Sequence, residues 1–171
     1  MSIIGLLLKG FGPTTGEVVP PPSGAALGHS PADIVRYLLV DLSRGTLPED
    51  ETTWPIYVSQ EPDSPDSCIT VYDTSGILEG RAQISGEIQE HYGIQIKVRA
   101  ASPTVAYTKI AEINSWIDES VRNNSVTIES SQYLVYAITR KGGILSLGKE
   151  LSASKRNLYT VNAIVSLVPV A

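Results

Sequence analysis

The sequence contains little of the side-chain chemistry on which catalytic and metal sites depend. Its 171 residues include one cysteine, Cys68, two histidines, His29 and His91, and one phenylalanine. A single cysteine excludes an intrachain disulfide and a cysteine-based zinc site. Neither histidine has a second histidine at the spacing of a helical metal site, which argues against metal ligation.

Charge is also scarce. Charged side chains make up 18% of the residues, and 13 Lys and Arg against 18 Asp and Glu give a formal net charge of −5. Tight nonspecific binding to nucleic acid needs a basic face that neutralises phosphates, so this balance disfavours a DNA-binding role. It fits a protein that DNA slides past without sticking, and a surface with few charges is typical of one that partners cover.

Motifs for catalysis or phosphate binding are missing as well. There is no G-x-S-x-G elbow, and Lys141-Gly142-Gly143 lacks the spacing of a P-loop and predicts a turn. The carboxylates have no EF-hand spacing, which favours a solvated surface over a calcium site. They form two groups near each other in sequence, Asp63, Asp66 and Asp73, and Glu79, Glu87 and Glu90. We therefore predict no enzymatic activity, no cofactor and no metal.

The first 29 residues differ in character from the rest. The apolar run at 3–8 ends at Lys9, far short of the ~20 residues of a membrane span, and no basic residue precedes it as in a signal peptide. Residues 11–29 are rich in proline and glycine, which disfavours regular structure. We predict an extended N-terminal arm at 1–29 that orders on assembly. A single domain follows at 30–171, with a long polar excursion at 74–92.

Two segments have the signals of helices. Ser30-Pro31 predicts a capped start, an apolar stripe follows, and Gly45 is expected to end the helix. Ser102-Pro103 predicts a second capped start, for a helix that reaches Arg122 and ends at Asn123-Asn124. The apolar stripes fall at helical spacing. Their members are Ile34, Val35, Leu38, Leu39 and Leu42 in the first, and Ala106, Ile110, Ile113, Ile117 and Val121 in the second.

The remaining segments predict strands. Residues 67–73 are rich in β-branched side chains, and 93–100 alternate strictly between apolar and polar residues. The excursion between them is either a long β-hairpin or a mobile loop. Further strands are expected at 54–60, an edge strand because of Pro55, and at 125–129, 132–140 and 158–168, while 144–151 is a strand or a surface loop. The fold class is therefore α+β, with a mostly antiparallel sheet and two main helices packed on one face.

One block is specific enough to suggest a family. The strand Asp66–Thr74, followed by the strand Gly93–Ala100 and a helix with an early tyrosine, Tyr107, resembles the bacteriophage minor capsid and tail-terminator proteins. The terminal strand Tyr159–Val168 is also in keeping with that family. The resemblance covers about 31–167 and leaves the N-terminal arm outside.

The resemblance implies a structural protein of the virion, placed at the head–tail junction and assembled in the host cytoplasm. It implies a homo-oligomeric ring, usually a hexamer, that caps the tail tube, stops its polymerisation and docks onto the head connector. DNA would pass through the lumen without specific binding, and no membrane is involved. The alternatives are another head–tail joining or tail-tube protein, a small phage enzyme, or a peptide-binding module that uses a sheet edge.

Candidate interface residues follow from shape alone. We expect the excursion to make axial or lumenal contacts through four charged residues, Glu79, Arg81, Glu87 and Glu90. For lateral contacts we expect four large apolar residues, Leu7, Phe11, Trp54 and Trp116. Trp116 lies off the helical stripe, and a partly buried position at the margin of the stripe is the alternative for it.

Overall fold

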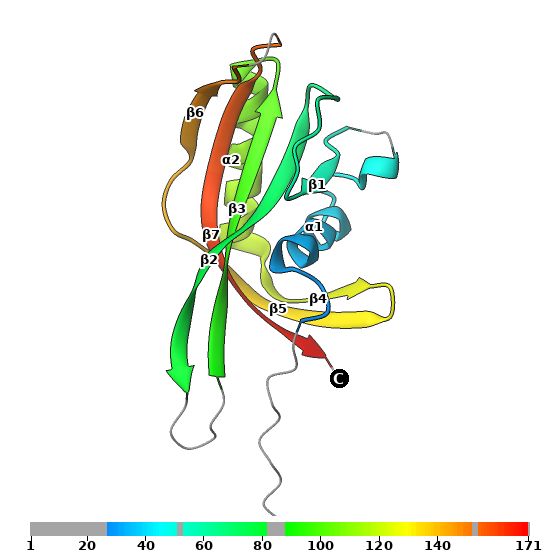
Figure 1. Ribbon diagram of the computed structural model, residues 1–171, viewed down its shortest axis with the longest axis vertical. Helices are drawn as coiled ribbons and strands as arrows, with labels where there is room; N and C mark the ends of the chain where they lie inside the picture. Colours follow the sequence, from blue (N-terminus) through cyan, green and yellow to red (C-terminus); the bar gives the residue numbers. More distant parts are fainter. Residues whose placement is uncertain (1–26, 51–52, 82–87, 152–153, 171) are drawn as a thin grey trace, which may run out of the picture.

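The structure is a computed structural model that describes residues 27–50, 53–81, 88–151 and 154–170 (Figure 1). The predicted arm at 1–29 lies almost wholly outside the described residues. In chain order the elements are α1 (Pro31–Asp41), the 3-10 helix η1 (Pro48–Asp50), β1 (Ile56–Val58), β2 (Cys68–Arg81), β3 (Ile88–Ala100), α2 (Pro103–Ser120), β4 (Arg122–Ile128), β5 (Ser131–Arg140), β6 (Leu145–Lys149) and β7 (Asn157–Val170).

The strands form one seven-stranded sheet in the order β1-β2-β3-β7-β5-β4, and β6 also pairs with β7. Only β1 and β2 are parallel within the described sheet; all the other pairs are antiparallel. The long strand β7 organises the sheet. One of its edges pairs with β3, and the other pairs first with β6 and then with β5. The segment at 144–151, for which a loop was the alternative, is thus a strand at its centre.

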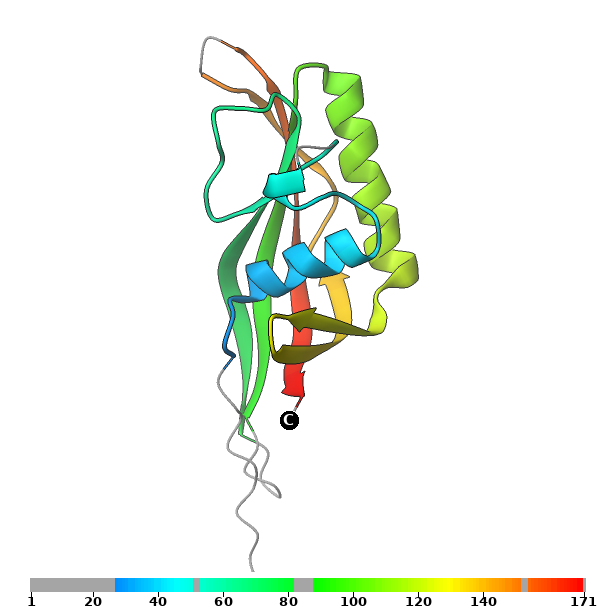
Figure 2. The ribbon, with the colours of Figure 1, turned by 90° about the vertical axis from the view of Figure 1, so that its right-hand side faces the viewer.

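Both helices cover the same face of the sheet, as Figure 2 shows edge-on, and this confirms the predicted α+β class. The alternation predicted for β3 places Ile94, Ile96 and Val98 on this face, where they are fully buried. The helices bury the apolar stripes that their spacing predicted, so the helices and the sheet share one hydrophobic core. The buried apolar residues of the helices are Ala32, Ile34, Val35, Leu38 and Leu39 in α1, and Ala106, Ile110, Ile113, Trp116 and Ile117 in α2.

The two helix starts differ in how they are capped. The Ser30 hydroxyl accepts a hydrogen bond of 3.1 Å from the backbone N–H of Asp33, as predicted. Ser102 occupies the corresponding position before α2, but its side chain makes no capping hydrogen bond. The prediction of a hydroxyl cap at Ser102 is therefore wrong, although the helix does begin at Pro103.

This difference gives a matched pair of variants. We expect Ser30→Ala to lower the free energy of unfolding by about 1 kcal/mol, because an N–H at the start of α1 loses its partner. Ser102→Ala should change it much less, since no capping bond is lost. Urea denaturation followed by circular dichroism measures both values. Equal losses in the two variants would contradict the assignment of the cap.

The helix ends differ from their predictions. Helix α1 ends at Asp41, and Ser43, not Gly45, takes the left-handed backbone with φ of 58°. Gly45 serves a close approach instead, since a Cβ there would lie 2.6 Å from the backbone oxygen of Trp54. Helix α2 ends at Ser120, and Asn123, with φ of 54°, already belongs to β4. The left-handed backbone predicted at the asparagine is thus present, but it lies inside β4 and not at the end of the helix.

Candidate assembly surfaces

The excursion predicted at 74–92 is part of a β-hairpin, formed by β2 and β3, that extends beyond the other strands of the sheet. Strand β3 pairs with β7 only from Tyr92 to Ala100, while residues 88–91 of β3 pair with β2 alone in the described part of the chain. Residues 77–81 and 88–91 therefore form a two-stranded ribbon. In Figure 1 this ribbon runs to the lower left, whereas the end of β7 runs to the lower right with β5 and β4. Of the two alternatives for 74–92, the hairpin is correct for the described residues.

Specific contacts set the direction of this ribbon. The Nδ1 atom of His91 lies 2.7 Å from the Oγ of Ser166, where β3 and β7 separate. The register of β2 and β3 shifts between Thr74 and Ile77, a bulge that bends and twists the pair. Gly93 lies at this bend, and a Cβ on it would be 2.3 Å from the backbone oxygen of Ser75. A side chain cannot fit there, so glycine permits the close approach of the two strands.

The ribbon carries the residues predicted to make axial or lumenal contacts. The backbone of Glu79 and Arg81 belongs to β2 and that of Glu90 to β3, whereas Glu87 lies outside the described residues. At the root of the ribbon Ile77 is 45% exposed, an unusual position for a large aliphatic side chain. The ribbon thus projects from the body with an exposed apolar residue at its root and with Glu79, Arg81 and Glu90 in its two strands.

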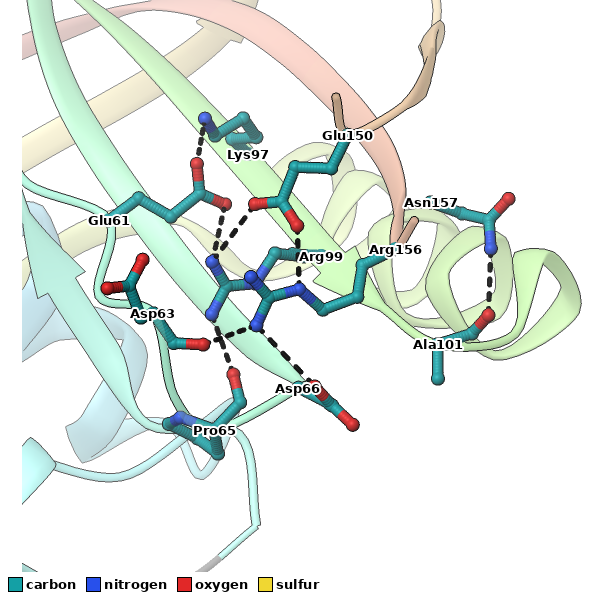
Figure 3. Close-up of polar contacts among 10 residues, drawn as sticks. All are labelled: Glu61, Asp63, Pro65, Asp66, Lys97, Arg99, Ala101, Glu150, Arg156 and Asn157. Carbon is teal, nitrogen blue, oxygen red and sulfur yellow. Dashed lines mark hydrogen bonds and ion pairs between the residues drawn. The ribbon is translucent and has the colours of Figure 1, made fainter. Parts of the chain in front are cut away.

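A cluster of charges around two buried arginines holds the opposite end of the molecule together, and Figure 3 shows it in close-up. We call it the ionic clasp and define it as Glu61, Lys97, Arg99, Glu150 and Arg156. Arg99 is 1% exposed and lies between the two glutamates, with Nη1 3.4 Å from Glu150 Oε1 and 3.6 Å from Glu61 Oε1. The second Glu150 oxygen accepts a hydrogen bond of 2.7 Å from Nε of Arg156. Glu61 also pairs with Lys97.

The clasp fastens two loops to the face of the sheet that the helices leave open. Arg99 donates to the backbone oxygen of Pro65 at 2.7 Å, and Arg156 donates to that of Asp63 at 2.5 Å. The first bond ties the loop before β2 to β3, and the second ties that loop to the loop before β7. Both loops lie at the end of the molecule away from the hairpin (Figures 1 and 2).

The electrostatics of the clasp are those of a paired cluster. Burial alone would lower the pKa of Lys97, but the hydrogen bond and the charge of Glu61 outweigh burial and raise it. The hydrogen bond from Arg156 to Glu150 raises the pKa of that guanidinium. Glu150 is the carboxylate that the two arginines share, so both guanidinium groups have a partner of opposite charge within the clasp.

The residues predicted for lateral contacts differ in how deeply they are buried. Trp54 is half-buried beside the core, and the Lys109 ammonium lies 5.6 Å from the centre of its ring. Trp116 is 3% exposed, so it is a core residue that a neighbouring subunit cannot reach. The prediction of an interface at Trp116 is therefore wrong, because α2 packs this residue into the core, more completely than the partly buried position that was the alternative. Leu7 and Phe11 lie outside the described residues.

Sequence reasoning missed the most exposed apolar strand. All five residues of β6 are exposed, and Leu145 and Leu147 keep 52% and 49% of their surface in contact with solvent. Tyr107, also predominantly exposed, makes an edge contact with Tyr159, which pairs with Ser146 of β6. The signal was present as the spacing Leu-Ser-Leu, but a segment this short does not reveal which edge stays open.

The described residues offer little for chemistry. They contain no group of three or more His, Cys, Asp or Glu side chains that could hold a metal ion. Cys68 is fully buried, and burial raises the pKa of its thiol, which disfavours a nucleophilic role. Nor does the described part of the chain include a helix long and apolar enough to cross a membrane.

Comparison with known proteins gives a family. A family model described as "Bacteriophage tail terminator protein" matches residues 25–169, from just before α1 to the end of β7. The comparison with curated proteins gave no match. The matched range includes the hairpin, the ionic clasp and β6.

Proposed function

The chain belongs to the bacteriophage tail terminator family, and from this premise we propose that it forms a ring on the end of the tail tube. As a family member it is a structural protein of the virion tail without enzymatic activity, and it associates with the tail tube. We propose further that the ring contains six subunits, stops tube polymerisation and presents its other face to the head connector.

The projecting ribbon is the observation that carries this proposal. A two-stranded hairpin is only marginally stable without a third strand or a helix beside it, so a long ribbon indicates a surface that a partner covers. Here the ribbon is fixed to the body by the bend at Gly93 and the contact between His91 and Ser166. We assign its charged positions, Glu79, Arg81 and Glu90, to axial or lumenal contacts.

The two ends of the subunit suit two different axial partners. The ribbon extends from one end, and the loops held by the ionic clasp form the other. Because the clasp already holds these loops in place, they would lose little conformational entropy when a partner binds. We therefore propose that one end meets the tube and the other the connector. With a net charge of −5, the subunit would let DNA pass through the lumen without specific binding.

The ring can be tested on the purified chain. We expect native mass spectrometry and negative-stain microscopy to show closed rings of about six subunits, because a heterologous contact that closes on itself gives a ring. Deleting the gene from the phage should give tails of irregular, excessive length without heads. Open tubes of the purified chain would indicate a tail-tube protein, and a strict monomer or normal joined tails after deletion would refute the proposal.

A further inference from the structure

Strand β6 has one paired edge and one open edge. Its residues pair with β7 between Leu145–Thr160 and Lys149–Asn157, and no other strand of the described chain pairs with its outer edge. Leu145 and Leu147 are about half exposed, and Leu151 just beyond the strand is fully exposed. Edge strands usually carry charged side chains or bulges that hinder pairing with other chains. Strand β6 has Lys149 at its end and a register shift against β7 between Ser146 and Gly148, so the exposed leucines are its main apolar surface.

The two terminal strands of the sheet path, β1 and β4, are less open to a partner. Thr46 already bridges Pro55 beside β1, and its backbone oxygen accepts a hydrogen bond of 2.9 Å from the N–H of Ile56. Strand β4 begins with the polar sequence Arg122-Asn-Asn-Ser125, and its apolar residues Val126 and Ile128 are buried in the core. Among the described strands, β6 is therefore the edge that combines unpaired backbone with exposed leucines.

The same chain contains a segment of matching chemistry. Residues 3–8, Ile-Ile-Gly-Leu-Leu-Leu, are all apolar, and in an extended conformation Ile4, Leu6 and Leu8 would point to one side. They lie outside the described residues, which begin at Leu27. Exposing such a segment to water is unfavourable, so burial of its apolar side chains against an apolar edge would favour binding there.

The length of the chain allows this contact to be made with a neighbouring copy. Gly28 and His29 lie beside Tyr133, which pairs with Pro169, whereas β6 begins opposite Thr160 of the same strand. That separation along β7 is roughly 30 Å at the usual rise per residue. Residues 9–26 can span up to about 60 Å when extended, which is enough to reach beyond their own subunit.

We propose that residues 3–8 of one subunit add an antiparallel strand to the open edge of β6 in the next subunit. The proposal rests on the ring proposed above and names its lateral contact. The antiparallel direction follows from charge: it puts Lys9 near Leu145, whereas a parallel strand would place it beside Lys149. Backbone hydrogen bonds supply the pairing, and the leucines of both strands cover each other.

Cysteine cross-linking tests the contact directly. One preparation carries Leu6→Cys and another carries Leu147→Cys, and the two are mixed and oxidised. Cys68 is fully buried, so it does not compete. We expect a disulfide-linked dimer that contains one chain of each kind, and none when Leu147→Cys is replaced by Thr127→Cys, an exposed position on β4.

The outcomes separate this inference from the ring itself. Rings in the microscope without the mixed dimer would overturn the β6 contact and leave the ring intact. A disulfide within one chain of a protein carrying both cysteines, without the mixed dimer, would show that the segment folds back and would also overturn it. Monomers without rings would refute both proposals.

A second variant checks the β6 surface without using the disulfide. Leu145→Asp with Leu147→Asp should fold normally, because both side chains are exposed in the monomer. We expect its subunits to dissociate at a concentration at least about tenfold higher, since two carboxylates would have to lie against leucines. Analytical ultracentrifugation measures this shift. Unchanged association in a folded variant would overturn the proposal.

Discussion

Replacing Glu150 with alanine is expected to lower the free energy of unfolding by about 3 kcal/mol, near the lower end of what the loss of one member of a buried ion pair costs. Glu150 is the carboxylate that both Arg99 and Arg156 contact in the ionic clasp. Without it two almost fully buried guanidinium groups each lose one carboxylate partner, and among the described carboxylates Arg156 keeps only the longer contact of 3.5 Å with Asp66. Glu61 and the backbone oxygen of Pro65 still contact Arg99, which keeps the loss from being larger.

The measurement is urea denaturation, with Asp118→Ala as the matched control. Asp118 forms a two-pronged ion pair with Arg140, at 2.8 and 2.6 Å, on the exposed surface between α2 and β5. Solvent screens such a pair, so its removal should destabilise the protein far less than Glu150→Ala does. If both variants lost the same stability, the clasp would be no more than a solvated surface network.

Shortening the hairpin is expected to abolish tail termination while the subunit stays folded. In this variant Asn-Gly replaces residues 79–89, so that Leu78 and Glu90, which already face each other, are joined by a two-residue turn. In the described chain the removed part of β2 pairs only with the removed start of β3. We therefore expect the free energy of unfolding to change by less than about 1 kcal/mol.

Complementation of a phage that lacks the gene measures the function of this variant. We expect heads and overlong tails that do not join, since the proposed axial contact is gone. The control carries Gly142→Ala and Gly143→Ala in the turn before β6, where an added Cβ meets nothing within 4 Å. It should fold and complement. Normal tails in a phage with the shortened hairpin would show that the ribbon is not needed for tail termination, and would refute the proposed axial contact.

Much of the fold could be read from local patterns. The alternation in Gly93–Ala100 predicted which residues of β3 face the core, because successive side chains of a strand point to opposite faces. The cap at Ser30 and the apolar stripes of both helices were predicted for the same reason: each depends on residues within a few positions of one another. The family resemblance also came from such local segments.

The candidate surfaces were harder to predict because they depend on contacts between distant residues. Trp116 illustrates this: its position off the stripe suggested a contact with another subunit, yet the packing of α2 on the sheet buries it. The three short charged stretches around Glu61, Lys97 and Glu150 gave no sign that they meet in one cluster. Only the pairing of β3 with β7 brings Arg99 beside the loop that contains Glu150 and Arg156.

The sequence alone therefore determined the helices, most of the strands, the fold class and the family. Those properties follow from backbone preferences and from side-chain periodicity, which act over short stretches of chain. The tertiary structure decided that 77–81 and 88–91 form a projecting ribbon, that five charges form a clasp around two buried arginines, and that β6 keeps an open apolar edge. These features depend on which strands become neighbours, since strand pairing joins residues far apart in the sequence.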